Sequence, residues 1–514
     1  MKNIITGSVV LLPLLVSCTK ESQPQRPNII FIMSDDHALS AISAYGTELA
    51  PLAPTPNIDC IAKNGAIFRA NYCCNSLSGP SRAAILTGKH SHKNGFLSNG
   101  SKAFNGSQQT LPKLLQAGGY QTAMIGKWHL ISKPTGFDHW KILNDQGDYN
   151  NPDFITDKDT VKYMGYVTKL ITQFTKEWLD TRDKDKPFFL MMHHKAPHRN
   201  WIPEEKYYRL YENTTFPVPE SYYDNYEGRK AASEQKMSVY RDMYDGYDLK
   251  MVTGVDSDSL MPGSWNASFN KMTAEEKVRF FEAYRQRNND FYQKSRTEKE
   301  IAEWKLQRYL QDYLSTVRSV DDSVGEILEY LKDNGLDENT IVVYVSDQGF
   351  YLGEHGWFDK RFMYEESLVM PMVMSYPKEI KAGSEVTYLT QNIDFAPTFL
   401  DMCGIEIPDD MQGKSFRPLL AGGKPDDWRK ELYYHYYEYP DYHSVKEHYG
   451  IKGERYKLMN FYKDNDWELY DLESDPQEMN NLYGRPGMEE ITLQLKESLV
   501  RLQQQYEVPE ELCK

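Results

Sequence analysis

Residues 78–82 read Ser-Gly-Pro-Ser-Arg, and this short stretch combines residue types that a site for an anion needs. Pro80 fixes the backbone angle that a first helical turn requires, so we expect a helix to begin near Ser78. Free backbone N–H groups at the start of a helix attract negative charge, which would draw an anion towards Ser78. The alternative interpretation is an ordinary capped helix that carries Arg82 on its surface.

Two pairs of oxygen-bearing side chains follow apolar runs of the sequence. Asp35 and Asp36 follow one run, and Asp347 and Gln348 follow another. Adjacent carboxylates repel each other, and burying them without a cation is costly. Oxygen ligands of this kind suit calcium or magnesium rather than zinc. We therefore predict a site for a hard cation, with a solvated turn or a helix cap as the alternative for the Asp pair.

Cationic side chains form a second candidate set: Arg82, Lys127, His129, His198 and Lys360. Lysine and arginine can hold the oxygens of an anionic ester, and a protonated histidine can donate a proton to the oxygen that leaves. Each of these residues could instead be a surface cation or a buried histidine that is bonded to the backbone. For His193 and His194 we keep that structural interpretation.

Short apolar runs alternate along the chain with longer amphipathic segments, which is typical of a parallel sheet covered by helices. Open α/β sheets bind ligands at the carboxyl ends of their strands. Four runs are followed directly by charged or polar side chains, so we predict an α/β fold that brings these side chains together. The runs are 29–33, 122–125, 188–192 and 341–345, and a further strand is expected at 372–375.

The length of the chain predicts a large domain and a smaller one. We assign residues 27–425 to the α/β domain, and within it residues 205–310 to a helical cover that precedes a helix at 313–331. Residues 426–514 contain aromatic runs with strand character followed by a final helical segment, which predicts a small α+β domain.

The first residues of the chain have the character of a targeting segment. Lys2 precedes a short apolar run, and residues 15–18 read Leu-Val-Ser-Cys, which resembles a bacterial lipobox. The resemblance implies a signal peptide at 1–17, lipidation of Cys18 and a polar tether at 18–26. We expect a lipid-anchored protein in the periplasm or at the surface of a Gram-negative bacterium, and a plain secretory signal is the alternative.

The formal net charge of −15 argues against nucleic acid as a partner, because phosphate binding needs a basic face. An anionic substrate would have to be drawn in by a local group of cations, against the field of the whole protein.

The motifs together resemble type I sulfatases. The shared pattern is Asp-Asp after the first strand, the 78–82 segment with the trailing Leu-Thr-Gly, Gly-Lys-Trp-His at 126–129, a Pro-His loop, Ser-Asp-Gln-Gly at 346–349 and a later Lys. This resemblance implies an alkaline-phosphatase-like fold in which the sheet is mostly parallel. It also implies that Ser78 is oxidised to formylglycine, and that one calcium ion is held by five residues: Asp35, Asp36, modified Ser78, Asp347 and Gln348.

The resemblance also implies roles for the cations. The hydrated aldehyde at position 78 would attack sulfur while Arg82 and a neighbouring lysine such as Lys127 hold the sulfate. His198 or Lys360 would protonate the departing alcohol, and His129 would help to expel the sulfate. A serine at the modified position resembles the bacterial type that a radical-SAM enzyme matures in anaerobes; replacement of a natural cysteine is the alternative.

The substrate is indicated by a more specific likeness. Residues 435–440, with His443 and residues 448–450, resemble N-acetylglucosamine-6-sulfatases of gut bacteria and animals. This likeness implies an exo-acting enzyme that acts on heparan, mucin or keratan glycans. It also implies that Asp359, Arg361 and His443 bind the sugar hydroxyls. A structural salt bridge is the alternative for the Asp–Arg pair. Other functions left open are a sulfatase for galactose or N-acetylgalactosamine sulfate, a phosphoester hydrolase of the same fold, and a non-catalytic glycan-binding lipoprotein.

Overall fold

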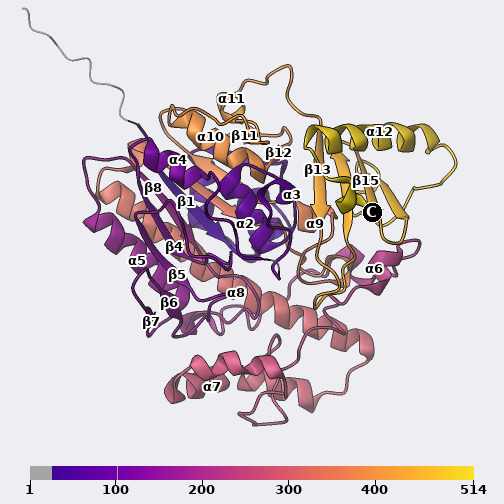
Figure 1. The fold of residues 1–514 in the computed structure, drawn as a ribbon. Helices are drawn as coiled ribbons and strands as arrows, with labels where there is room; N and C mark the ends of the chain where they lie inside the picture. Colours follow the sequence, from indigo (N-terminus) through magenta and orange to yellow (C-terminus); the bar gives the residue numbers. More distant parts are fainter. Residues whose placement is uncertain (1–25, 101) are drawn as a thin grey trace, which may run out of the picture.

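The computed structural model describes residues 26–100 and 102–514 (Figure 1). The predicted signal peptide at 1–17 and the predicted lipidation site Cys18 lie outside the described residues. None of the helices in the described ranges combines the length and the apolar character that a membrane crossing requires.

Within the described ranges, ten strands form one large sheet in the order β11-β2-β10-β9-β1-β8-β4-β5-β6-β7. All five predicted strands belong to it. The strands are β1 (Asn28–Ser34), β2 (Ala66–Phe68), β4 (Gln121–Gly126), β5 (His139–Leu143), β6 (Asp153–Ile155), β7 (Thr160–Lys162), β8 (Phe188–His193), β9 (Thr340–Ser346), β10 (Met372–Ser375) and β11 (Ser384–Val386). A separate short pair joins β3 (Asn71–Tyr72) to β12 (Thr390–Gln391).

The sheet is mixed, with a parallel centre. Strands β9, β1, β8, β4 and β5 run parallel to one another, whereas β10 pairs antiparallel with both β9 and β2, and β6 pairs antiparallel with β5 and β7. The predicted α/β class is correct, and the mostly parallel description holds for the central strands. The register aligns Met33 with His193 and Ser34 with Ser346, so the ends of three neighbouring strands meet at one edge.

Helices cover both faces of the sheet, as the alternation of side chains along β1 requires. Ile29 and Phe31 face one core with α2, α4 and α10, whereas Ile30 and Ile32 face a second core with α1, α5 and α8 (Figure 1). These helices are α1 (Pro56–Lys63), α2 (Ser78–Thr87), α4 (Leu111–Ala117), α5 (Val167–Thr181), α8 (Glu298–Asp333) and α10 (Phe395–Met402). Shorter helices are α3 (Ser91–Asn94), α6 (Lys230–Glu234), α9 (Glu365–Leu368) and α11 (Arg417–Leu420).

The segment predicted as a helical cover is less helical than expected. It contains α6 and α7 (Ala274–Gln293), but residues 235–263 form mainly turns and loops. The helix predicted at 313–331 is longer than expected, because α8 begins at Glu298 and runs unbroken to Asp333. A capping box at Thr297, in which its side chain and that of Glu300 each bond the other's backbone N–H, fixes this earlier start.

The C-terminal region folds as predicted, with one additional strand. In the described chain an antiparallel sheet of four strands is covered by α12 (Glu489–Gln505). Its strands are β13 (Glu431–Tyr436), β14 (His448–Gly453), β15 (Tyr456–Phe461) and β16 (Asp466–Asp471). Residues 448–450, which carry part of the substrate resemblance, begin β14. The other face of this sheet joins the core of α2 and α10 through Tyr434, Met459 and Tyr470, so the two regions share one interior.

Candidate active site

Ser78 lies at the first position of α2, as the sequence predicts. Its side chain is buried, and Oγ donates a 2.8 Å hydrogen bond to Oδ1 of Asp35 at the end of β1. The next residue must be small, because a Cβ on Gly79 would lie 2.6 Å from the Phe96 ring and 2.8 Å from Asn99 Oδ1. The helix start is therefore held tightly against the carboxylate.

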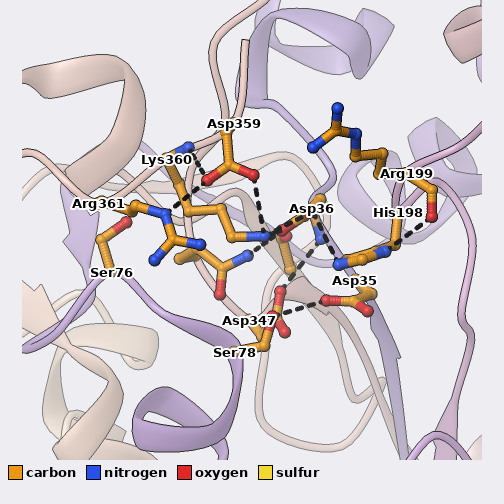
Figure 2. Close-up of polar contacts among 12 residues, drawn as sticks. Asp35, Asp36, Ser76, Ser78, His198, Arg199, Asp347, Asp359, Lys360 and Arg361 are labelled. Carbon is orange, nitrogen blue, oxygen red and sulfur yellow. Dashed lines mark hydrogen bonds and ion pairs between the residues drawn. The ribbon is translucent and has the colours of Figure 1, made fainter. Parts of the chain in front are cut away.

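Charged residues from several strand ends and loops surround Ser78 (Figure 2). All of them are buried, so their charges must be balanced by one another or by a bound ion. We refer to this group as the inner cluster: Asp35, Asp36, Ser78, Arg82, Lys127, Asp347 and Lys360.

Arg82 and Lys127 each bind one of the strand-end carboxylates. Arg82 donates to Asp347 Oδ2 from Nε at 3.2 Å and from Nη2 at 3.0 Å, and to the backbone oxygen of Lys127 at 2.8 Å. Lys127 Nζ contacts Oδ2 of Asp35. Burial lowers the pKa of Lys127 well below its ordinary value, and the neighbouring lysines Lys195 and Lys360 lower it further. An anion that enters here would meet fixed donors rather than mobile surface charges.

Lys360 and His198 approach Asp36 from two sides (Figure 2). Lys360 Nζ lies 2.7 Å from both oxygens of Asp36, and His198 Nε2 lies 3.7 Å from Oδ2. His198 Nδ1 donates to the backbone oxygen of Arg199 at 2.9 Å, which orients the ring. Burial, together with Lys127, Lys360 and Lys195, lowers the pKa of His198 well below its ordinary value. A nearby anion would favour its protonated form.

His129 is also at the site, although its contacts are peripheral. Its Nε2 accepts a 3.0 Å hydrogen bond from the side-chain amide of Gln146 and lies 3.8 Å from Asp145 Oδ1. Burial lowers its pKa well below the ordinary value, and the positive charges of Lys127 and Arg82 add to that shift. His193 Nδ1 accepts from Arg82 or donates to the backbone oxygen of Lys127, and His194 Nε2 pairs with the Ser323 hydroxyl; a structural role for both remains a prediction.

The predicted oxygen ligands suit a hard cation. Asp36 N donates to Asp347 Oδ1 at 3.1 Å, which brings the two strand ends together, and Oε1 of Gln348 is buried without a hydrogen-bond partner. Asp35, Asp36 and His198 offer atoms that all lie within 4.8 Å of one another. His198, which was not among the predicted ligands, thus lies close enough to Asp35 and Asp36 to contact a cation that these two carboxylates hold.

The carboxylates of the inner cluster differ in their protonation. Burial raises the pKa of Asp36 to about 7, and the neighbouring Asp347 and Asp359 act in the same direction against Lys360. Burial would also raise the pKa of Asp347, but Arg82, Lys127 and Lys360 hold it below its ordinary value. Burial and the neighbouring carboxylates therefore outweigh Lys360 in setting the pKa of Asp36, whereas the three cations outweigh burial in setting the pKa of Asp347.

The three predicted sugar contacts come together beside Lys360. His443 Nε2 lies 3.4 Å from Asp359 Oδ2, and Arg361 Nε donates to Asp359 Oδ1 at 3.1 Å. Arg361 also donates to Glu438 Oε1 at 2.8 Å and lies 3.2 Å from Asp441 Oδ2. The salt bridge that the sequence left as an alternative is present. We refer to the group as the loop cluster: Asp359, Arg361, Glu438, Asp441 and His443.

Comparison with known proteins identifies the family. The model of the family described as Sulfatase matches residues 27–405, and the model described as N-sulphoglucosamine sulphohydrolase, C-terminal, matches residues 353–505. The chain belongs to the sulfatase family. As a sulfatase with the alkaline-phosphatase-like fold, it is a sulfuric ester hydrolase.

Several proteins to which this sulfatase is similar carry an amino sugar in their names or descriptions. An N-acetylglucosamine-6-O-sulfatase of Bacteroides thetaiotaomicron is 50% identical, over 97% of this chain and 91% of that protein. A structure described as a complex with its substrate D-glucosamine-2-N,6-O-disulfate has a TM-score of 0.90 at 50% identity, covering 94% of this chain and 98% of the other. The human N-acetylglucosamine-6-sulfatase is 25% identical over 80% of this chain and 67% of its own length.

Several residues of this sulfatase's site were missed from the sequence. Glu438 accepts from Arg361 and, through Oε2, from the backbone N–H of Asn99 at 2.7 Å, while Asn99 Oδ1 accepts from Gly79 N at 3.0 Å. This chain of bonds joins the loop cluster to the residue after Ser78. Gln146 was also missed. The only signal in the sequence was that Glu438 lies inside the 435–440 stretch that carries the substrate resemblance.

Proposed function

We propose that this sulfatase removes the 6-O-sulfate from N-acetylglucosamine at the end of a host glycan of heparan, mucin or keratan type. The observation that carries the proposal is the contact between the two clusters: Lys360 Nζ lies 2.7 Å from Asp36 and 3.8 Å from Asp359. A sulfate in the inner cluster would therefore place the sugar that bears it against the loop cluster. The name of the 50% identical relative supports this sugar, and the description of the 50% identical solved structure supports a glucosamine that carries a 6-O-sulfate.

The loop cluster has the chemistry to recognise neighbouring sugar hydroxyls. Asp359 accepts hydrogen bonds and Arg361 donates them, so one hydroxyl can donate to the first while the next accepts from the second. His443 adds a ring nitrogen that is fixed by the bond between its Nδ1 and the backbone oxygen of Lys236 at 2.9 Å. A sugar without the matching hydroxyls would not make these hydrogen bonds, so we expect the site to discriminate against it.

In the inner cluster, Arg82 and Lys127 are proposed to hold the sulfate oxygens. His198 and Lys360 are proposed as alternative donors of the proton to the departing sugar oxygen, since both lie beside Asp36, His198 Nε2 at 3.7 Å and Lys360 Nζ at 2.7 Å. His129, beside Gln146, is proposed to take up the proton that is released when sulfate departs. Each proposed role is either to stabilise negative charge on the sulfate or to donate or accept a proton.

The oxygen ligands are proposed to hold one calcium ion. Asp35, Asp36, Asp347, Gln348 and the modified Ser78 would be its ligands, with the unpartnered Gln348 Oε1 supporting the assignment. When bound, the ion would neutralise the carboxylates and polarise the sulfate ester. Calcium added to chelator-treated protein should raise the thermal midpoint, because binding to the folded state alone stabilises it.

Ser78 is proposed to be oxidised to formylglycine by an anaerobic radical-SAM maturation enzyme. The hydrated aldehyde would supply the nucleophile and then a second hydroxyl that allows the sulfate to be expelled, which a serine cannot do. Peptide mass spectrometry of protein from an anaerobic host that has the maturation enzyme should find the loss of two hydrogens at Ser78. Unmodified serine in such protein would contradict the proposed chemistry.

The substrate is tested by comparing 6-O-sulfated N-acetylglucosamine with galactose 6-sulfate and N-acetylgalactosamine 4-sulfate. We expect kcat/KM to favour the first by about 10²-fold or more, which is the range for a site built around specific hydroxyls. Equal turnover of the three would leave the sulfatase class intact and remove the sugar assignment. A glycan-binding protein without activity would hydrolyse none of them, and a phosphoester hydrolase would prefer the matching phosphate ester.

The location is proposed from residues outside the described part of the chain. The lipobox-like residues 15–18 support a lipid anchor on Cys18 and a position in the periplasm or at the cell surface of a Gram-negative bacterium. Labelling of the wild-type protein by a radioactive fatty acid, and its loss in Cys18→Ala, would test the anchor. Membrane-free wild-type protein without label would contradict it.

A further inference from the structure

A closed series of ring contacts runs around the side of the site where the two clusters meet. It begins at Arg199, next to His198, whose guanidinium is fixed by Asp248 at 2.7 and 2.6 Å. The guanidinium carbon lies 5.8 Å from the centre of the Tyr247 ring and 5.0 Å from that of Phe358. Figure 2 shows Arg199 and His198 across Asp36 from Asp359 and Arg361.

Two exposed aromatic residues close this series on the outside. Tyr247 lies 6.2 Å from Trp265, Trp265 lies 5.6 Å from Tyr442, and Tyr442 precedes His443 in the chain. His443 completes the circuit through an edge contact of 5.5 Å with Phe358. Within the series Trp265 and Tyr442 stand out, because 44% and 63% of their surfaces are exposed. We refer to these two residues as the aromatic rim.

The exposure of the rim needs an explanation, because Tyr442 is 63% exposed whereas the next residue in the chain, His443, is only 5% exposed. Trp265 comes from the 3-10 helix η5 (Ser264–Lys271) of the cover, and Tyr442 comes from the loop between β13 and β14. Two separate segments therefore place large rings together at the edge of the site. Aromatic faces of this kind offer flat apolar area at little cost in side-chain entropy, and sugar rings present flat C–H faces to them.

We propose that the aromatic rim binds the sugar that is linked to the reducing end of the sulfated sugar. This inference rests on the proposed function, in which the inner and loop clusters enclose the sulfated ring. A glycan chain must leave that enclosure, and the rim continues directly from His443 into solvent. The ring that follows the sulfated one is the part of the substrate that would reach Trp265 and Tyr442. The site would then recognise at least two sugars, the second by stacking rather than by charge.

The test compares two substrates across variants. Wild type, Trp265→Ala, Trp265→Phe and Tyr442→Ala are assayed with 6-O-sulfated N-acetylglucosamine and with a tetrasaccharide that carries the same sugar at its non-reducing end. We expect Trp265→Ala to lower kcat/KM for the tetrasaccharide about 10-fold, mainly through KM, and to change the monosaccharide value by less than about twofold. Trp265→Phe should recover most of the loss, because a flat ring remains.

Tyr223→Ala is the matched control, since Tyr223 is also about half exposed but contacts Tyr222 and Glu303, outside the ring series. Equal losses on both substrates, or no loss on the tetrasaccharide, would overturn the rim proposal. Titration of the tetrasaccharide into Ser78→Ala and into Ser78→Ala/Trp265→Ala gives a readout without turnover. Equal affinities of the two variants for the tetrasaccharide, or no binding of the tetrasaccharide to Ser78→Ala, would also overturn the rim proposal. Absence of wild-type activity on the 6-O-sulfated monosaccharide would instead count against the proposed function.

Discussion

The inner cluster and the loop cluster are adjacent, and Asp359, Arg361 and His443 are buried like the inner cluster, yet the chain builds the two in different ways. Asp35, Lys127 and Asp347 follow strands of the central sheet directly, so their positions are set by the register of the sheet. The loop cluster combines Asp359 and Arg361, from a loop of the α/β region, with Glu438, Asp441 and His443, from a loop of the C-terminal region. A reaction centre that depends on the sheet can remain constant while loops beside it change the substrate.

The largest expected effect comes from removing one charge in the inner cluster. Asp347→Asn should lower kcat by about 10³-fold for every sulfate ester, because fixed charge at the reacting group acts on the transition state whatever the alcohol is. The variant leaves Arg82 without its paired carboxylate, so we also expect the free energy of unfolding to fall by about 3 kcal/mol. Turnover of the sugar sulfate and of a small aryl sulfate, with urea denaturation, measures both.

The control for this variant is Asp410→Asn, which makes the same chemical change at an exposed carboxylate that pairs with Lys89. That change should leave turnover within about twofold and stability within about 0.5 kcal/mol of wild type. If Asp347→Asn impaired the sugar sulfate but spared the aryl sulfate, the division between the two clusters would be wrong.

A smaller and more selective effect is expected in the loop cluster. His443→Ala should lower kcat/KM for 6-O-sulfated N-acetylglucosamine by about 10²-fold, because one sugar contact is lost and Asp359 loses a partner. A small aryl sulfate lacks the sugar hydroxyls, so its kcat/KM should change by less than about threefold. Steady-state kinetics on the two substrates gives the ratio.

Tyr439→Ala serves as the control for that experiment, since Tyr439 lies in the same loop, is about half exposed and is outside the loop cluster. Unchanged sugar kinetics in His443→Ala would mean that the loop is misassigned, whereas equal losses on both substrates would place His443 in the inner cluster.

The same contrast explains how much of the molecule the sequence could predict. The strand-end residues were placed correctly because the last residue of each apolar run marks the carboxyl end of a strand, and parallel strands bring such ends to one edge. Ser78 was placed for a local reason, the proline two residues into the helix. The pairings among Arg82, Lys127 and the carboxylates could not be predicted, since each joins residues far apart in the chain.

The loop residues were harder, because their geometry depends on tertiary contacts. Asp359 and Arg361 have φ angles of 76° and 92°, which local sequence preferences for non-glycine residues do not favour. Glu438 bonds Arg361 and also Asn99, which lies more than 300 residues earlier in the chain. Strand β14 was missed because Gly450 and Gly453 weaken the strand pattern; Gly450 is required there, since a Cβ would collide with the backbone oxygen of Leu458.

The smallest effect on turnover is expected from Glu468, a buried carboxyl outside both clusters, which tests what burial does to a carboxyl whose hydrogen-bond partners are hydroxyls rather than cations. Glu468 on β16 is fully buried but is bonded by hydroxyls, from Tyr364 at 2.6 Å and Tyr470 at 2.7 Å. Burial raises its pKa to about 7, against an ordinary value of 4.5. The folded state therefore holds an extra proton between these values, and its stability falls as pH rises through that window, by up to about 3 kcal/mol.

Glu468→Gln should remove this part of the pH dependence in urea denaturation at pH 5 and pH 8 while leaving turnover within about twofold. An unchanged slope would mean that Glu468 is ionised in the fold, and that burial without a cation does not suffice to neutralise a carboxyl here.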